Sequence, residues 1–191
     1  MRYIERKNSV VYKFTGPTPP PIDLPAGYGW SRISHECLDK FFAPKMQDWR
    51  LKTYRKLLDK GHIGFLIHDQ VEWAAVQWLS TPESPGPDHL PTRISQGKFW
   101  CFNEHTREEH RRLGLWRALK SIGVRYIRST SDCQGMTIYS DTGVENLASR
   151  KAHQNFGFEP AGTIDRLTIV IPKVTALNWG AWAQEQVHPP R

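Results

Sequence analysis

Residues 99–120 read FWCFNEHTREEHRRLGLWRALK, and this stretch decides the fold class. Its first part belongs to the aromatic segment Gly97–Thr106, which is typical of a buried strand. The second part predicts a helix over Arg111–Arg128, because apolar residues recur there at helical spacing: Leu115, Leu119, Ile122 and Tyr126. A strand that enters a helix through a glycine turn leaves backbone N–H groups open at the helix start. The stretch therefore predicts an α/β unit with a candidate anion-binding turn.

Basic side chains gather at the predicted turn: Arg107, His110, Arg111 and Arg112. Cations at a helix N-terminus are mildly unfavourable, so helix stability does not account for them. Two interpretations stay open from the local pattern, an anion site and an exposed basic turn. The whole chain carries a formal charge of +7, which favours an anionic partner such as nucleic acid, an acidic substrate or a phosphorylated cofactor.

The elements around this stretch alternate between strand and helix patterns. Upstream we expect strands at Ser9–Phe14 and near Trp30–Ile33, a helical region over His35–Lys60 interrupted at Pro44, and two strands in His62–Ser80 around a turn at His68–Gln70. Downstream we expect a strand at Met136–Ser140, a helix at Glu145–Phe156 closed by Gly157, and a strand at Leu167–Ile171. The proline-rich residues 16–27 are expected to be extended, and residues 81–91 to form a surface loop. This order predicts a mixed α/β fold.

Length and composition exclude several classes of protein. A chain of 191 residues with 39% hydrophobic and 12% aromatic residues suits a folded domain and not a disordered one. No apolar run approaches the roughly 18 residues of a membrane span, and residues 1–7 open no signal-peptide pattern. Three cysteines, Cys37, Cys101 and Cys133, do not form a disulfide framework. We expect a soluble, cytoplasmic protein.

A second informative segment runs from Asn146 to Phe158. On a helix, Asn146, Arg150 and His153 share one face. The residues expected to form the buried stripe are Ala148, Ala152 and Phe156. The alternative is an ordinary amphipathic helix whose polar face contacts only water.

Together the two segments resemble the GCN5-related N-acetyltransferase (GNAT) superfamily. Its first motif runs from a strand into Arg/Gln-x-x-Gly-x-Gly/Ala at a helix start, and Arg111–Trp116 matches it. Its later motif is an Asn-led helix that ends in Gly-Phe, as Asn146 through Gly157-Phe158 do. The likeness covers about residues 97–172. It departs from the family at Trp116, where Gly or Ala is usual, and at His153, where many members carry Tyr.

The resemblance implies a mixed, mostly antiparallel twisted sheet, flanked by helices and splayed between the strands Phe99–Thr106 and Met136–Ser140. It implies residues 1–27 as an N-terminal strand and proline-rich segment, 28–172 as a GNAT-like acyltransferase domain and 173–191 as a tail. Acetyl-CoA or another acyl-CoA would lie in the splay, with no metal. The implied coenzyme-binding residues are Glu104, His105, Thr106, Arg111, Arg112, Leu113, Gly114, Leu115, Trp116, Asn146, Ser149 and Arg150.

Acyl transfer to an amine needs a base for the amine and an acid for the thiolate. The glutamate base of histone-modifying members would fall at Trp100. Strand alternation predicts Glu104 on the same face, so Glu104 is our first candidate base and Asp141, at the end of the next strand, the second. The alternative for each carboxylate is an ordinary solvated or arginine-paired strand end. His153 is the candidate acid, with a titration near its ordinary pKa of about 6.5. Aromatic residues expected beside the acceptor, with core packing as the alternative, are Trp73, Trp100 and Tyr139.

The function that these residues indicate is transfer of an acyl group from acyl-CoA directly to a primary amine of a small molecule, amino sugar or amino acid. Two alternatives stay open: a catalytically weak GNAT-fold coenzyme A-binding module, and a basic nucleic-acid-binding protein. Cys101, His105 and His110 match no common metal-ligand spacing, so we expect no metal. No known nucleic-acid-binding module is present, no membrane partner is expected, and monomer and homodimer are both open.

Overall fold

An eight-stranded sheet in the order β2-β3-β4-β5-β6-β1-β7-β8 forms the centre of the computed structural model, which describes residues 3–42, 48–130, 135–170 and 177–183. Neighbouring strands are antiparallel except β5 and β6, which are parallel. The strands are β1 (Tyr3–Phe14), β2 (Gly29–Arg32), β3 (Ile63–His68), β4 (Trp73–Ser80), β5 (Phe99–Thr106), β6 (Ile138–Gly143), β7 (Glu159–Val170) and β8 (Leu177–Ala183). The predicted mixed, mostly antiparallel fold is confirmed.

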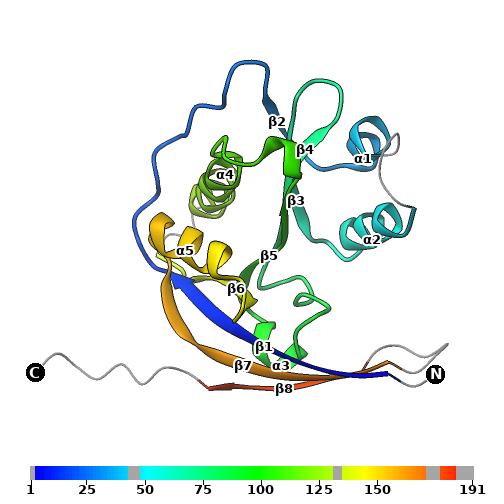
Figure 1. The fold of residues 1–191 in the computed structure, drawn as a ribbon, viewed down its shortest axis with the longest axis vertical. Coiled ribbons are helices and arrows are strands. Elements are labelled where there is room, and N and C mark those ends of the chain that lie inside the picture. Colours follow the sequence, from blue (N-terminus) through cyan, green and yellow to red (C-terminus); the bar gives the residue numbers. More distant parts are fainter. Residues whose placement is uncertain (1–2, 43–47, 131–134, 171–176, 184–191) are drawn as a thin grey trace, which may run out of the picture.

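The helices lie on both sides of the sheet. Figure 1 shows α4 (Leu115–Ser129) and α5 (Leu147–Phe156) on one side, and α1 (His35–Phe41) and α2 (Asp48–Asp59) on the other. Two short helical segments, α3 (Thr92–Ser95) and the 3-10 turn η1 (Glu108–His110), flank β5 in the sequence. Each side has its own apolar cluster, one around Leu38, Tyr54 and Trp100 and the other around Phe65, Leu119 and Phe158. None of the helices in the described ranges is long and apolar enough to cross a membrane.

Strands β5 and β6 separate after a short parallel contact, which positions the site described below. They pair only from Phe99 with Ile138 to Cys101 with Ser140. Beyond that point β5 continues to Thr106 and β6 to Gly143, each without the other as a partner. The splay therefore lies where the sequence predicts it.

A β-bulge in β5 changes which side chains face each side of the sheet. The register with β4 shifts between Val76 and Trp78, and Asn103 has a left-handed φ of 49°. An extra residue in one strand reverses the alternation beyond it. Trp100 consequently packs in the cluster beside α1 and α2, whereas Glu104 contacts Lys120 of α4. The prediction that Trp100 and Glu104 share a face is wrong for this reason.

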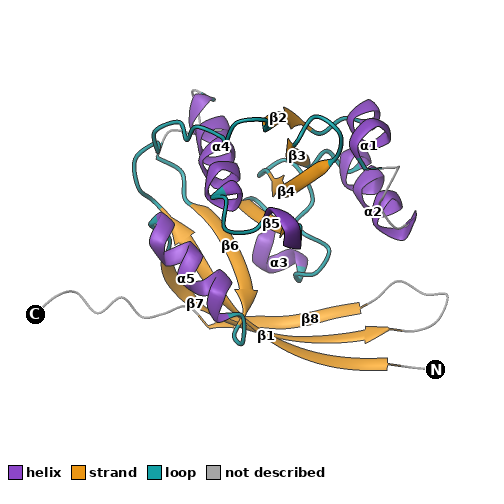
Figure 2. Ribbon diagram, turned by 45° about the horizontal axis from the view of Figure 1, so that its top comes forward, coloured by secondary structure: helices purple, strands orange, loops and turns teal. Residues whose placement is uncertain are grey.

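Several element boundaries differ from the sequence prediction. Helix α4 begins at Leu115 and not at Arg111, because Arg112 and Gly114 have left-handed φ values of 67° and 75°. Strand β8 falls in the predicted tail, where Trp182 Nε1 donates a hydrogen bond to the Ala161 carbonyl oxygen at 3.0 Å. The sequence analysis also missed helix α3, and it predicted β1 and β7 shorter than they are. Figure 2 shows β1, β7 and β8 running side by side, so strands from the first and last described parts of the chain join one sheet. The division at residues 27 and 172 stays a prediction.

The two predicted loops have defined contacts. The proline-rich segment runs alongside α4 in space (Figure 1), and Ser121 Oγ donates a hydrogen bond to the Pro20 carbonyl oxygen at 2.8 Å. Residues 81–91 form a loop as expected, although Leu90 enters the core. The predicted break at Pro44 and the cysteine Cys133 lie outside the described residues.

Candidate functional site

A cavity of about 840 Å³ lies between the separated ends of β5 and β6 and the start of α4. Most of the predicted coenzyme-binding and catalytic residues line it: Glu104, His105, Thr106, Arg111, Arg112, Gly114, Leu115, Trp116, Asp141, Asn146, Ser149 and His153. The splay and the helix start thus bring together residues from β5, β6, α4 and α5.

Five of the predicted site residues lie elsewhere. Trp73 and Trp100 are buried in the core, and Tyr139 stacks on Trp100 with ring centroids 5.5 Å apart. Leu113 is exposed and outside the cavity lining. Arg150 donates to the Val144 carbonyl oxygen at 3.1 Å and faces a different hollow, so it does not share the cavity face with Asn146 and His153.

The start of α4 presents open backbone donors to the cavity. Gly114 is the N-cap, and no side chain among the described residues caps this helix. A Cβ placed on Gly114 would meet no atom within 4 Å, so the space beside this residue is open. Uncapped N–H groups at the positive end of a helix of 15 residues attract anions. The cavity therefore has a site suited to phosphate oxygens.

Glu104 is the counter-ion of a buried lysine. Lys120 Nζ forms an ion pair with Glu104 Oε1, and Trp116 Nε1 donates to Glu104 Oε2 at 2.7 Å. The Lys120 side chain is fully buried and that of Glu104 is 11% exposed. Trp116 therefore turns its indole inward to the carboxylate and leaves the space beside Gly114 open.

His153 is held by hydrogen bonds on both ring nitrogens. The Ser149 carbonyl oxygen lies 2.8 Å from Nδ1, and because a carbonyl only accepts, Nδ1 carries the proton. Nε2 then accepts from the Ser140 hydroxyl at 2.9 Å. Burial, and next the positive charge of Lys120, lower the pKa of His153 to about 4. This value lies below the ordinary pKa of about 6.5 expected from the sequence, so the buried ring is neutral at neutral pH.

Helix α5 presents an unexpected face to the sheet. Ala148 and Ala152 line the cavity, and His153 is the buried residue of this helix. Asn146 caps the helix, with Oδ1 accepting from Ser149 N–H at 3.1 Å, and Gly157 closes it in the predicted left-handed conformation. The predicted alanine stripe is wrong because His153 finds polar partners inside, whereas the alanines face open space.

Asp141 is bound by two donors from the α1/α2 side of the sheet. His89 Nε2 and Trp100 Nε1 each lie 2.9 Å from Asp141 Oδ1. Burial alone would raise the pKa of Asp141, but His89, Trp100 and Arg166 together hold it below the ordinary value. The side chain of Asp141 is 5% exposed and that of His89 37%. This is a histidine–carboxylate pair at the cavity wall.

Sequence reasoning missed Lys120, His89 and Ser140. Lys120 lies one turn after Trp116, so the two side chains share a helix face, which is a usable signal. His89 lies in a loop, and Ser140 in a strand, with no local pattern that marks either residue.

Comparisons with known proteins place the fold. No protein-family model and no curated protein sequence matches this chain. Among solved structures, the chain is similar to a tandem GNAT protein from the clavulanic acid biosynthesis pathway, with 15% identity and a TM-score of 0.59, over 92% of this chain and 53% of that one. It is also similar to a putative acetyltransferase of the GNAT family from Novosphingobium aromaticivorans, with 14% identity and a TM-score of 0.61, over 88% of this chain and 66% of that one.

A third similar structure is the aminoglycoside acetyltransferase AAC(6')-Iy in complex with the bisubstrate analogue CoA-S-monomethyl-acetylneamine. Its identity is 17% and its TM-score 0.51, over 69% of this chain and 90% of that one. The chain spans only about half to two thirds of the length of the two structures above, at 53% and 66%. At these identities the likeness shows a shared fold.

Proposed function

We propose that this chain, which has the GNAT fold, is an acyl-CoA-dependent N-acyltransferase acting on a primary amine of a small molecule. The main observation in support of this proposal is the cavity of about 840 Å³, which runs from the uncapped start of α4 into the β5–β6 splay. A cytoplasmic location stays a prediction.

Phosphate groups of the coenzyme would bind at the turn before α4. Backbone N–H groups after Gly114 and the exposed side chain of Arg112 face this end of the cavity. The strand edge of β5 beyond Cys101 has no partner in β6, so its backbone is available to an amide-rich arm. Acyl-CoA would supply the thioester that the amine attacks, and coenzyme A would be the thiol product.

We propose His89 as the general base, with Asp141 as its positioning residue. Asp141 is ionised, so it accepts the Nε2 proton of His89 and leaves Nδ1 unprotonated. The imidazole is partly exposed and contacts Phe102, which with Asp141 lines the cavity. The amine nitrogen would bond to the thioester carbon and pass a proton to His89 Nδ1 while the thiolate leaves. Glu104 is less suited to this role, because both its oxygens already bind donors.

We propose that the buried ammonium of Lys120, which lies behind Ser140 and His153, stabilises the departing thiolate, and that the neutral His153 does not act as its acid. Ser140 and His153 line the cavity, and Lys120 Nζ lies 3.4 Å from Ser140 Oγ behind them. A buried positive charge next to developing negative charge lowers the barrier of the step that forms it. Solvent then protonates the thiolate.

The test is thiol release from acetyl-CoA with a panel of primary amines, alongside calorimetric binding of coenzyme A. Replacing the base, His89→Gln, should lower turnover by roughly 10²–10⁴-fold near neutral pH while coenzyme affinity is kept. Asp141→Asn should lower turnover and move the pH profile, because it changes the tautomer of His89. The control is His35→Gln, an exposed histidine paired with Asp59 at 3.5 Å. Coenzyme binding without turnover on any amine would contradict the enzyme, and no binding would contradict the site.

Trp116 favours the alternative of a coenzyme-binding module with weak catalysis. Its indole lies 5.0 Å from the His153 ring and forms part of the cavity wall where the family has Gly or Ala. Trp116→Ala distinguishes the two functions, because it enlarges the cavity without touching His89. If the chain is a weakly catalytic module whose cavity is narrowed by the Trp116 indole, the variant should gain turnover. If the chain is an enzyme in which Trp116 holds Glu104 in place, the variant should lose turnover.

A further inference from the structure

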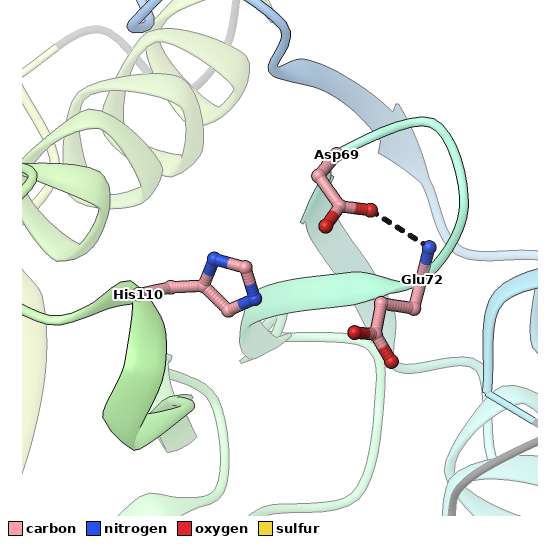
Figure 3. Close-up of side chains that lie close together, drawn as sticks. All are labelled: Asp69, Glu72 and His110. Atoms are coloured by element: carbon pink, nitrogen blue, oxygen red, sulfur yellow. Dashed lines mark hydrogen bonds between the residues drawn. The ribbon is translucent and has the colours of Figure 1, made fainter.

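Three potential metal-ligating side chains meet where the β3–β4 turn lies against η1. Figure 3 shows Asp69 and Glu72 from the turn facing His110 at the end of η1. One ligand atom from each, two carboxylate oxygens and an imidazole nitrogen, lie within 4.8 Å of one another. Because about 40 residues separate the turn from His110, only the folded chain brings them together.

Both carboxylates are fixed in place by the chain itself. Asp69 Oδ1 accepts the N–H groups of Val71 at 3.1 Å and Glu72 at 2.9 Å, which closes the turn. Glu72 Oε2 pairs with Arg107 Nη1 at 2.6 Å. A carboxylate has a second oxygen and several lone pairs, so this pairing is compatible with a metal ligand.

His110 carries the decisive observation. It is 8% exposed, and the Tyr28 hydroxyl lies 2.7 Å from its Nδ1. Its Nε2 is buried and has no hydrogen-bond partner among the described residues. Figure 3 shows one ring nitrogen of His110 directed at the carboxylates, and since Tyr28 holds Nδ1, this nitrogen is Nε2. A buried ring nitrogen without a partner, aimed at two carboxylates, is an arrangement that a bound cation would satisfy.

We propose that Asp69, Glu72 and His110 bind a divalent transition metal such as Zn²⁺. One imidazole nitrogen with two carboxylate oxygens is a donor set for Zn²⁺ or a similar ion, whereas Ca²⁺ and Mg²⁺ prefer oxygen ligands alone. Tyr28 would serve as the outer partner that fixes the ring and its tautomer, as is usual for metal-binding histidines.

The metal would tie the β3–β4 turn to the segment that leads into α4. His110 lies two residues before Arg112 and four before Gly114, the two left-handed residues that shape the turn at the helix start. A metal on His110 would therefore restrict this turn. The metal site does not depend on the proposed acyl transfer, because binding can be measured without any coenzyme or amine.

The experiment uses the full chain, treated with a chelator and then titrated with Co²⁺, whose visible absorption reports its ligands. The wild type should bind one Co²⁺ per chain, and Zn²⁺ should displace it. Asp69→Asn and His110→Gln should each weaken Co²⁺ binding at least tenfold, and Tyr28→Phe, which keeps all three ligands, should weaken it by about 10–100-fold. The control His35→Gln, at an exposed histidine–aspartate pair, should bind like the wild type.

Circular dichroism at the titration temperature shows whether each variant is folded. If His110→Gln does not fold, Tyr28→Phe and Asp69→Asn carry the test. The proposal is overturned if the wild type shows no saturable Co²⁺ binding at neutral pH. It is also overturned if folded ligand variants bind as the wild type does, or if His35→Gln loses as much affinity as Asp69→Asn.

Discussion

Replacing Lys120 by methionine should destabilise the fold strongly, because it leaves a buried carboxylate without its counter-ion. Lys120 is fully buried, pairs with Glu104 and lies over the rings of Phe158 at 4.9 Å and Trp116 at 5.3 Å. Methionine keeps the apolar stem but removes the charge, so Glu104 retains only the Trp116 N–H. Breaking one partner of a buried pair costs about 3–5 kcal/mol. At this chain length that corresponds to a fall in Tm of roughly 6–20 °C.

The double variant separates the charge effect from packing. Glu104→Gln with Lys120→Met removes both charges, and such neutral replacements are often close to the wild type in stability. We expect a coupling of about 2 kcal/mol or more between the two sites, in the range seen for residues in contact. Urea unfolding at neutral pH, followed by circular dichroism, gives the four free energies of unfolding. The exposed Lys151→Met is the control and should stay within about 0.5 kcal/mol of the wild type. A loss below about 1 kcal/mol for Lys120→Met, or additive single and double variants, would refute the reasoning.

Three further predictions concern His153, Gly114 and Asn103. Because the pKa of His153 is about 4 in the folded chain and about 6.5 in the unfolded chain, its contribution to stability is present above pH ~6.5 and is lost as pH falls toward 4. Urea unfolding over this window should show that the free energy of unfolding falls by about 3 kcal/mol, and His153→Gln should make this fall smaller. The same pH dependence of the free energy in the wild type and in His153→Gln would contradict the pKa shift. Gly114→Ala should lower the free energy of unfolding by about 1 kcal/mol, because Gly114 has a left-handed φ of 75°. It should also weaken coenzyme binding, which calorimetry would measure with Gly97→Ala as the control. Asn103→Gly should leave the free energy of unfolding unchanged, whereas Asn103→Val should lower it by about 1–3 kcal/mol, because valine tolerates the left-handed φ of 49° poorly. An Asn103→Val variant as stable as the wild type would contradict the bulge.

Local patterns predicted the elements of this fold better than their pairing. The spacing of Leu115, Leu119, Ile122 and Tyr126 marks α4, and Gly157 marks the end of α5, because both signals depend on nearby residues. No local signal shows that β1 lies between β6 and β7, since strand order depends on contacts far apart in the sequence. Strand β8 was missed for the same reason: within the described residues it is an edge strand that pairs with β7 alone.

The parts of the candidate site that depend on local backbone conformation were predicted, and the parts that depend on contacts between distant side chains were missed. The glycine turn before α4 is a property of the backbone, so Gly114 and Leu115 lie where the motif places them. The face of Glu104 depends on one bulge residue, Asn103, of a type that tolerates left-handed φ and therefore offered a weak signal. His89 reaches Asp141 across 52 positions of sequence, and no spacing rule predicts such a contact.

The two departures from the GNAT pattern, Trp116 in α4 and His153 in α5, have one physical cause. The bulge at Asn103 directs Glu104 to the α4 side of the sheet, where its carboxylate is nearly buried. A buried carboxylate requires donors, and Trp116 and Lys120, one helical turn apart, supply an indole N–H and an ammonium. The same ammonium, next after burial, lowers the pKa of His153, so the ring beside it stays neutral. A large indole at position 116 is thus compatible with an open turn at Gly114, because the carboxylate draws it away from the helix start and into the wall of the cavity.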